Sequence, residues 1–109
     1  MTVVSKQLAA TNFGDASVHD LYTVPAGKRT IVKNMLARGA SGSASHATWS
    51  VFDGATSLFS FNVYLAASGS DGDTSIINPW IVLNAGQTLK VQFSATGGWV
   101  SVSGAELVL

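Results

Sequence analysis

Cysteine is absent from the 109 residues, and charged side chains are scarce. Without Cys, the chain has no disulfide scaffold, thiol catalysis or thiolate metal site. Only six basic and six acidic side chains are present, and zero net charge argues against a nucleic-acid partner, because phosphate binding needs clustered excess Lys and Arg. No stretch reaches the roughly 18 apolar residues of a membrane span, and no secretory signal opens the sequence. We therefore expect a protein used without export, with no nucleic-acid or membrane partner.

The length fits one domain spanning residues 1–109. A chain of this size buries roughly two-thirds of its surface on folding, so one hydrophobic core suffices without disulfide or metal staples. The low charge leaves little electrostatic repulsion between copies, which suits a protein that ends up in an assembly.

Apolar residues alternate with polar ones, as in half-buried strands. The pattern predicts about eight strands, near residues 2–9, 19–24, 29–37, 47–53, 57–65, 75–83, 87–94 and 99–108. One face of the fifth predicted strand collects Phe59, Phe61, Val63 and Leu65. Asp53-Gly54 is the strongest hairpin signal, since both residues tolerate positive φ. No window predicts a substantial helix, so we expect an all-β fold, an antiparallel β-sandwich or jelly roll.

Two features refine this expectation. Val24-Pro-Ala-Gly-Lys-Arg-Thr-Ile-Val and Leu83-Asn-Ala-Gly-Gln-Thr-Leu-Lys-Val both read as a strand end, an Ala-Gly turn and a new strand, which agrees with the related halves of a double Greek key. Residues 1–17 fit either an edge strand or an arm that adds to a neighbouring subunit's sheet. We favour the ordinary strand.

Candidate catalytic and metal-binding residues are few. His19 and His46 are the only histidines, and a metal site or proton shuttle would need further partners beside them. No Gly-x-Ser-x-Gly motif supports a hydrolase. Asp71 and Asp73 could offer two oxygens to Ca²⁺, but the further ligands of an EF-hand loop are missing. We expect no enzyme activity, no metal and no cofactor, and we interpret the Asp71/Asp73 segment as a solvated turn.

Four of the six positive charges fall within eleven residues: Lys28, Arg29, Lys33 and Arg38. They predict either contact with an acidic partner surface or a charge-guarded edge strand.

The three tryptophans divide into two kinds. Trp49 alternates with Val51 and is expected in the core, whereas Trp80 and Trp99 follow turn residues. Aromatic side chains near loops anchor protein interfaces, and they also stack on sugars. We select Trp80 and Trp99, with the four basic residues, as candidate protein contacts.

Three segments resemble small virion proteins of tailed bacteriophages: Leu21-Tyr-Thr-Val-Pro-Ala-Gly-Lys-Arg-Thr-Ile-Val-Lys, Ile81-Val-Leu-Asn-Ala-Gly-Gln-Thr-Leu-Lys-Val and Val100-Ser-Val-Ser-Gly-Ala-Glu-Leu. The resemblance covers roughly residues 20–108 and consists of turn and strand signatures without a catalytic motif. It implies a jelly-roll structural protein of the virion, of the head decoration or cement type.

Such a protein would bind across subunits of the major capsid protein as a symmetric homo-oligomer, with a trimer favoured over a dimer. It would be made in the host cytoplasm and end on the capsid surface. The alternative is a tail or fibre module that binds a host receptor or carbohydrate through the loops at residues 39–46 and 68–74. A small hydrolase is a third hypothesis, which only the abundance of Ser supports.

Overall fold

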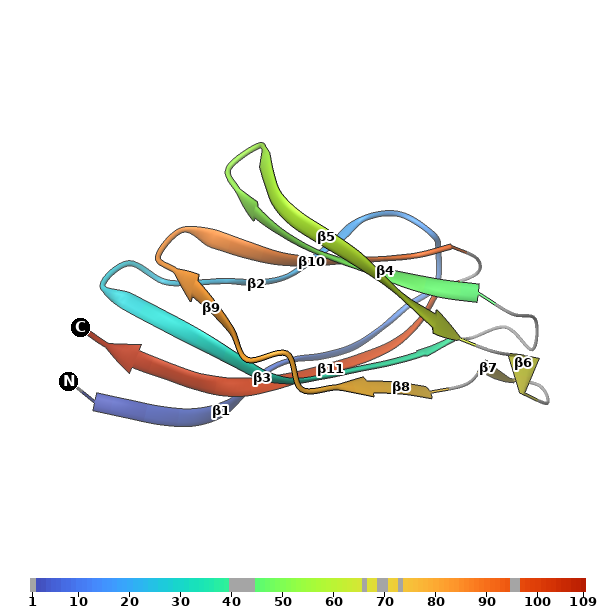
Figure 1. The fold of residues 1–109 in the computed structure, drawn as a ribbon, viewed down its shortest axis with the longest axis horizontal. Helices are drawn as coiled ribbons and strands as arrows, with labels where there is room; N and C mark the ends of the chain where they lie inside the picture. Colours follow the sequence, from blue (N-terminus) through green and yellow to red (C-terminus); the bar gives the residue numbers. More distant parts are fainter. Residues whose placement is uncertain (1, 40–44, 66, 69–70, 73, 95–96) are drawn as a thin grey trace.

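The computed structural model describes residues 2–39, 45–65, 67–68, 71–72, 74–94 and 97–109 (Figure 1). Every regular element in this part of the chain is a β-strand, and none of it forms a helix able to cross a membrane. The strands are β1 (Thr2–Phe13), β2 (His19–Thr23), β3 (Lys28–Gly39), β4 (Ser45–Asp53), β5 (Thr56–Leu65), β6 (Ala67–Ser68), β7 (Asp71–Gly72), β8 (Thr74–Ile77), β9 (Ile81–Asn84), β10 (Gln87–Phe93) and β11 (Gly98–Val108).

Two antiparallel sheets face each other across the core (Figure 1). Sheet A has the order β1-β11-β3, with β8 and β9 following one another along the far side of β3, and sheet B has the order β2-β10-β4-β5. Among the described residues, strands β6 and β7 pair only with each other, in a small separate sheet. Counting β8 and β9 as one position, each sheet has four positions, and the chain passes from one sheet to the other at every step except the β4–β5 hairpin. This is the jelly-roll order. The expected all-β antiparallel sandwich is confirmed.

One predicted strand is divided in two. The sequence pattern predicts a continuous strand at 75–83, but β8 ends at Ile77 and β9 begins at Ile81. Pro79 cannot donate a ladder hydrogen bond, and Trp80 has a φ of 51°, in the left-handed region that non-glycine residues rarely adopt. The chain therefore kinks at this edge of sheet A, and the Trp80 side chain projects into solvent.

The core lies between the sheets and takes the inward residues of both. Its largest fully buried side chains include Trp49, Phe93, Met35, Leu83 and Leu89. The expectation that Trp49 belongs to the core is confirmed. Fully burying an apolar side chain of this kind stabilises the fold by about 1.5–3 kcal/mol, so these residues are the main source of stability.

The two similar Ala-Gly turns lie side by side in space. Gly27 and Gly86 both have positive φ, of 77° and 86°, which glycine adopts without a steric penalty. The Val24 amide donates to the Gln87 carbonyl at 3.0 Å, and the Gly86 amide donates to the Val24 carbonyl at 2.9 Å. The sequence similarity therefore marks two adjacent turns at one end of the sandwich.

The N-terminal segment forms β1, an edge strand of sheet A that pairs with β11 from Thr2 opposite Val108 to Phe13 opposite Gly98. Its register shifts between Gln7 and Ala9. The segment is thus placed as an ordinary strand within its own sheet.

Candidate interaction surface

The four basic residues singled out in the sequence all lie on β3, which runs through sheet A between β11 and β8/β9. Their surroundings differ, because alternate residues of a strand face opposite sides of the sheet. Thr30 and Val32 are fully buried against the core, whereas Arg29 and Arg38 are exposed. The β3–β11 register pairs Ser103 with Asn34 and Gly104 with Val32, so Lys33 is the additional residue of a bulge.

Lys28 belongs to a polar cluster within the end of the sandwich. Glu106 on β11 is only 4% exposed, and its Oε1 atom lies 3.5 Å from Lys28 Nζ and 3.1 Å from Lys6 Nζ. The hydroxyl of Tyr22 donates to Glu106 Oε2 and lies 3.1 Å from Thr30 Oγ1. Buried carboxylates are costly unless they are paired and hydrogen-bonded, and these contacts supply both. Lys28 therefore neutralises an internal acid, a contact that the sequence analysis missed.

This cluster shifts two pKa values in opposite directions. The hydrogen bond from Tyr22, reinforced by that from Lys6 and by the positive charge of Lys28, holds the pKa of Glu106 below its ordinary value against the opposing effect of burial. Burial, together with the neighbouring Glu106 carboxylate, raises the pKa of Tyr22. Both shifts favour an ionised Glu106 beside a neutral Tyr22 at neutral pH.

The other three basic residues lie toward the outer face of sheet A. Arg29 Nε donates to Asn84 Oδ1 at 3.1 Å, which joins β3 to β9. Lys33 Nζ lies 5.1 Å from the centroid of the Trp80 ring, and the guanidinium carbon of Arg38 lies 5.5 Å from that of Trp99. Both distances are within the range of cation–π attraction.

The two cation–π pairs stand on the same sheet with apolar residues between them. Lys33 and Arg38 are five residues apart on β3, roughly 16 Å along an extended strand. Between them, Leu36 pairs with Ile76 of β8, which is 58% exposed. We name this surface the sheet A patch; its residues are Lys33, Leu36, Arg38, Ile76, Trp80 and Trp99.

Sequence reasoning found four residues of the sheet A patch and missed Leu36 and Ile76. Strand alternation would have placed both on the outer face, beside the outward-facing residues of β3. Whether Leu36 and Ile76 are exposed, however, depends on which other elements cover that face. The sequence pattern does not predict this coverage.

Trp80 combines an exposed side chain with an unfavourable backbone conformation. It is 62% exposed, and its φ of 51° is one that a large aromatic residue adopts at a cost of about 1–3 kcal/mol. The ammonium group of Lys33 lies over the ring. A large apolar side chain kept in a strained and solvent-exposed position is a candidate anchor for a partner protein.

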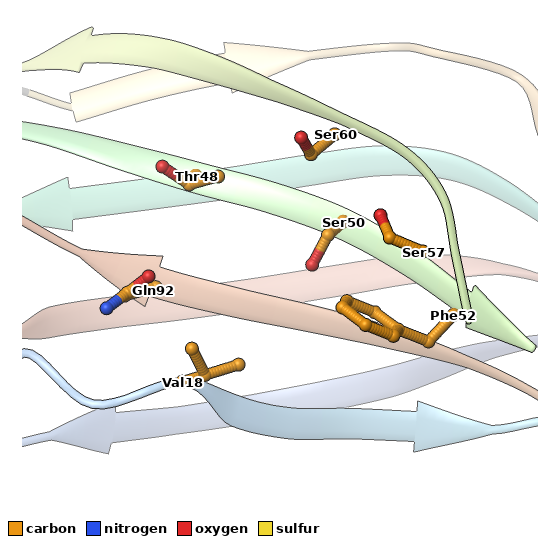
Figure 2. A pocket seen from close by; sticks show the side chains of 7 residues that line it. All are labelled: Val18, Thr48, Ser50, Phe52, Ser57, Ser60 and Gln92. Atoms are coloured by element: carbon orange, nitrogen blue, oxygen red, sulfur yellow. The ribbon is translucent and has the colours of Figure 1, made fainter. Parts of the chain in front are cut away.

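The outer face of sheet B carries an uncharged hollow of about 190 Å³ (Figure 2). Its lining includes the hydroxyl groups of Thr48, Ser50, Ser57 and Ser60, the Gln92 amide and the Phe52 ring. Thr48 donates to Asn62 at 2.6 Å, and Gln92 donates to the Ala16 carbonyl at 3.0 Å.

The positive charge of Lys90, which lies beside this hollow, is paired with a carboxylate. Lys90 Nζ lies 4.4 Å from the Phe52 ring centroid and 3.3 Å from Asp20 Oδ1. A second hollow of about 260 Å³, which includes His46 and Ser94, shares Thr48 and Gln92 with the first. The two hollows together present hydrogen-bonding groups suited to a neutral polar ligand.

The candidate metal ligands are not brought together in the described ranges, where no group of three or more His, Asp and Glu side chains could hold an ion. His19 Nε2 is 2.7 Å from Asp15 Oδ1, and its ring stacks on Phe13 with 3.9 Å between centroids. The Ser17 amide and His19 lower the pKa of Asp15. The side chains of Asp71 and Asp73, and most of the loops expected at 39–46 and 68–74, lie outside the described residues.

Comparison with known proteins yields similarity of structure alone. No family model and no curated protein matches the sequence. The Drosophila NLP-core, whose crystal structure addresses pentamer formation and histone binding, is similar with a TM-score of 0.54 and 11% identity, over 94% of this chain and 99% of that one. A chain of infectious bursal disease virus (Gt strain) gives a TM-score of 0.40 and 12% identity, over 96% of this chain but 32% of that one. The first similarity concerns the fold only.

Proposed function

We propose that this protein is a non-enzymatic structural protein of a phage virion, a decoration or cement subunit that binds across neighbouring major capsid subunits on the head surface. It is made in the host cytoplasm and acts after the shell has assembled. A protein that binds only the assembled shell stabilises that shell by mass action, without any catalytic group.

The sheet A patch is the observation that carries this proposal. It combines two exposed aromatic rings, two cations held against them and two apolar side chains between them on one face. Aromatic and Arg side chains surrounded by polar groups supply most of the binding energy in protein interfaces. Positive charge at Lys33 and Arg38, with Arg29 nearby on β3, suits an acidic surface of the capsid.

The proposal includes assembly of the chain with itself. Zero net charge and many exposed apolar side chains favour association. The Drosophila NLP-core, which has a similar fold, forms a pentamer, so this architecture is compatible with assembly into an oligomer.

The test is co-sedimentation of the purified protein with heads of the phage that encodes it. We expect saturable binding to the heads. The double variant Arg29→Glu/Lys33→Glu should bind at least about tenfold more weakly, because it reverses charge beside Trp80. The control Arg29→Lys/Lys33→Arg keeps both charges and should bind like the wild type. Equal binding by all three proteins would refute the role of this face.

A second candidate is a tail or fibre module that binds a neutral carbohydrate, and the hollow on sheet B favours it (Figure 2). Hydroxyl and amide groups beside the Phe52 ring fit a sugar, which presents hydroxyl groups and an apolar ring face. A glycan array probed with the wild type and with Phe52→Ala/Gln92→Ala separates the candidates. Hits that the double variant loses would support this function, and an array without hits would remove it.

A further inference from the structure

The edges of the two sheets differ in how they are protected against pairing with another strand. An exposed edge strand offers unpaired amide and carbonyl groups to any added strand, and proteins block this with charge, proline, bulges or short strands. Among the described residues, the outer positions are β1 and β8/β9 in sheet A and β2 and β5 in sheet B. All four edges therefore need such a block.

Three of the four edges have a feature that blocks pairing with another strand. Strand β1 has a register irregularity and directs Lys6 Nζ to the buried Glu106. Strand β2 has five residues, of which Asp20 is charged. The β8/β9 edge is broken at Pro79, with Trp80 in a left-handed conformation. A second strand laid along any of these edges would meet a charge, a kink or a short strand.

Strand β5 lacks these features over most of its length. Thr56–Leu65 contains no charged residue, no proline and no glycine, and its one irregularity lies before Phe59, where the β4–β5 register shifts. Within the described part of the chain, β5 pairs only with β4. The seven residues from Phe59 to Leu65 therefore form a regular, uncharged edge that is rich in strand-forming side chains.

The inner face of β5 is also incompletely covered. Phe59 pairs with Val51 and Phe61 with Trp49, so both phenyl rings face the same side as core residues. Leu65 is fully buried at the far end of the strand, yet Phe59 remains 41% exposed. The rings of Phe59 and Phe61 are nearly parallel, with 6.5 Å between centroids. Part of an apolar row therefore reaches solvent along the free edge.

The order of residues in this strand is self-complementary. When two antiparallel copies are aligned with Phe61 opposite its own copy, Phe59 faces Val63 and Ser60 faces Asn62. Apolar residues then meet apolar ones on the inner face, and polar residues meet polar ones on the outer face. A shift of one residue would place inner side chains opposite outer ones.

We propose that β5 pairs with β5 of a second copy across a two-fold axis at Phe61, joining the two copies of sheet B into one continuous sheet. The self-complementary order and the absence of charge favour a second copy as the occupant. In this two-fold register Phe61 meets its own copy, and a residue close to the axis also lies near its own copy. A charged residue there would therefore lie near a like charge. The proposed assembly is a dimer, whereas the resemblance to virion proteins favours a trimer. This pairing involves only copies of the chain, so it does not depend on whether the protein binds capsids.

Disulfide trapping tests this register, because the chain contains no native Cys. Facing residues of an antiparallel pair have Cα atoms about 4.5–5.5 Å apart, within reach of a disulfide. Ser60→Cys and Asn62→Cys proteins should therefore cross-link when mixed under mild oxidation. Each alone should cross-link poorly, because equivalent residues lie about 8 Å apart across the axis, given the rise per residue. No preference for the mixture would overturn the proposed register.

Solution mass tests the interface without trapping. Light scattering after size exclusion should give twice the 11.3 kDa mass of the chain at micromolar concentration. Tyr64→Lys changes a side chain that is 71% exposed, so the fold should survive, and it should shift the protein to the monomer mass. The matched control Val3→Lys adds the same charge on β1 and should remain dimeric. A monomeric wild type, or a dimer lost in Val3→Lys and kept in Tyr64→Lys, would overturn the proposal.

Discussion

Lys28 Nζ lies 3.5 Å from Oε1 of Glu106, a carboxylate enclosed by the end of the sandwich. This contact separates Lys28 from the other basic residues of β3. Arg29, Lys33 and Arg38 lie toward the outer side of sheet A, whereas Lys28 contacts an enclosed carboxylate. The proposed binding surface therefore includes three of the four clustered basic residues and leaves out Lys28.

The first prediction follows from this division. Lys28→Met should lower the free energy of unfolding by about 1 kcal/mol, because Glu106 loses one of its two cations while the partly exposed Lys6 pair remains. The folded variant should bind heads as the wild type does. Urea unfolding and co-sedimentation measure the two quantities. Unchanged stability combined with lost binding would assign Lys28 to the interface instead.

Replacement of Trp80 should separate stability from binding. Asn adopts positive φ more readily than Trp, so Trp80→Asn should keep or slightly raise the free energy of unfolding, by up to about 1 kcal/mol. The same change removes the exposed ring and should weaken head binding at least about tenfold. A variant that unfolds more easily and binds normally would contradict the assignment of Trp80 as an anchor.

Glu106 should make the stability of the fold sensitive to acid. Its pKa is lower in the folded protein than in the unfolded chain, so its contribution is complete above the unfolded pKa. The contribution is lost as the pH falls from about 5 through the folded pKa. The unfolding free energy of the wild type should therefore decline more between pH 6 and pH 3 than that of Glu106→Gln. Parallel declines would show that Glu106 does not carry this dependence.

Any side chain at position 104 should lower the free energy of unfolding. A Cβ at this position would lie 2.0 Å from the carbonyl oxygen of Ile31 on the neighbouring strand β3. Gly104→Ala should therefore cost about 1–3 kcal/mol through displacement of the β3–β11 pair. Gly14→Ala is the control, because nothing lies within 4 Å of its Cβ. Thermal unfolding that is equal for the two variants would contradict the close approach.

Much of the fold follows from local patterns in the sequence. Alternation locates the strands best where one face is buried, as in β3, β4, β10 and β11, and it correctly assigns Trp49 to the core. Asp53-Gly54 correctly marks the β4–β5 hairpin, where Gly54 has a φ of 61°. The jelly-roll order itself depends on long-range pairing, such as that of β1 with β11, which short-range patterns do not encode.

The proposed interaction surfaces are harder to predict from the sequence, because the exposure of their residues depends on coverage by distant elements. Phe59 and Leu65 share one face of β5 and look equivalent in the sequence, yet only Leu65 is enclosed. Lys28 and Lys33 look alike on β3, but one meets Glu106 and the other meets Trp80. In each case the deciding neighbour lies on another strand.

The most direct test of the account is the thermal stability of the phage head with and without this protein. DNA-filled heads that lack the protein should release DNA at a lower temperature than heads to which wild-type protein has been added back. The Arg29→Glu/Lys33→Glu variant should fail to restore the higher temperature. Release at one temperature in all three preparations would contradict the proposed role as a capsid cement.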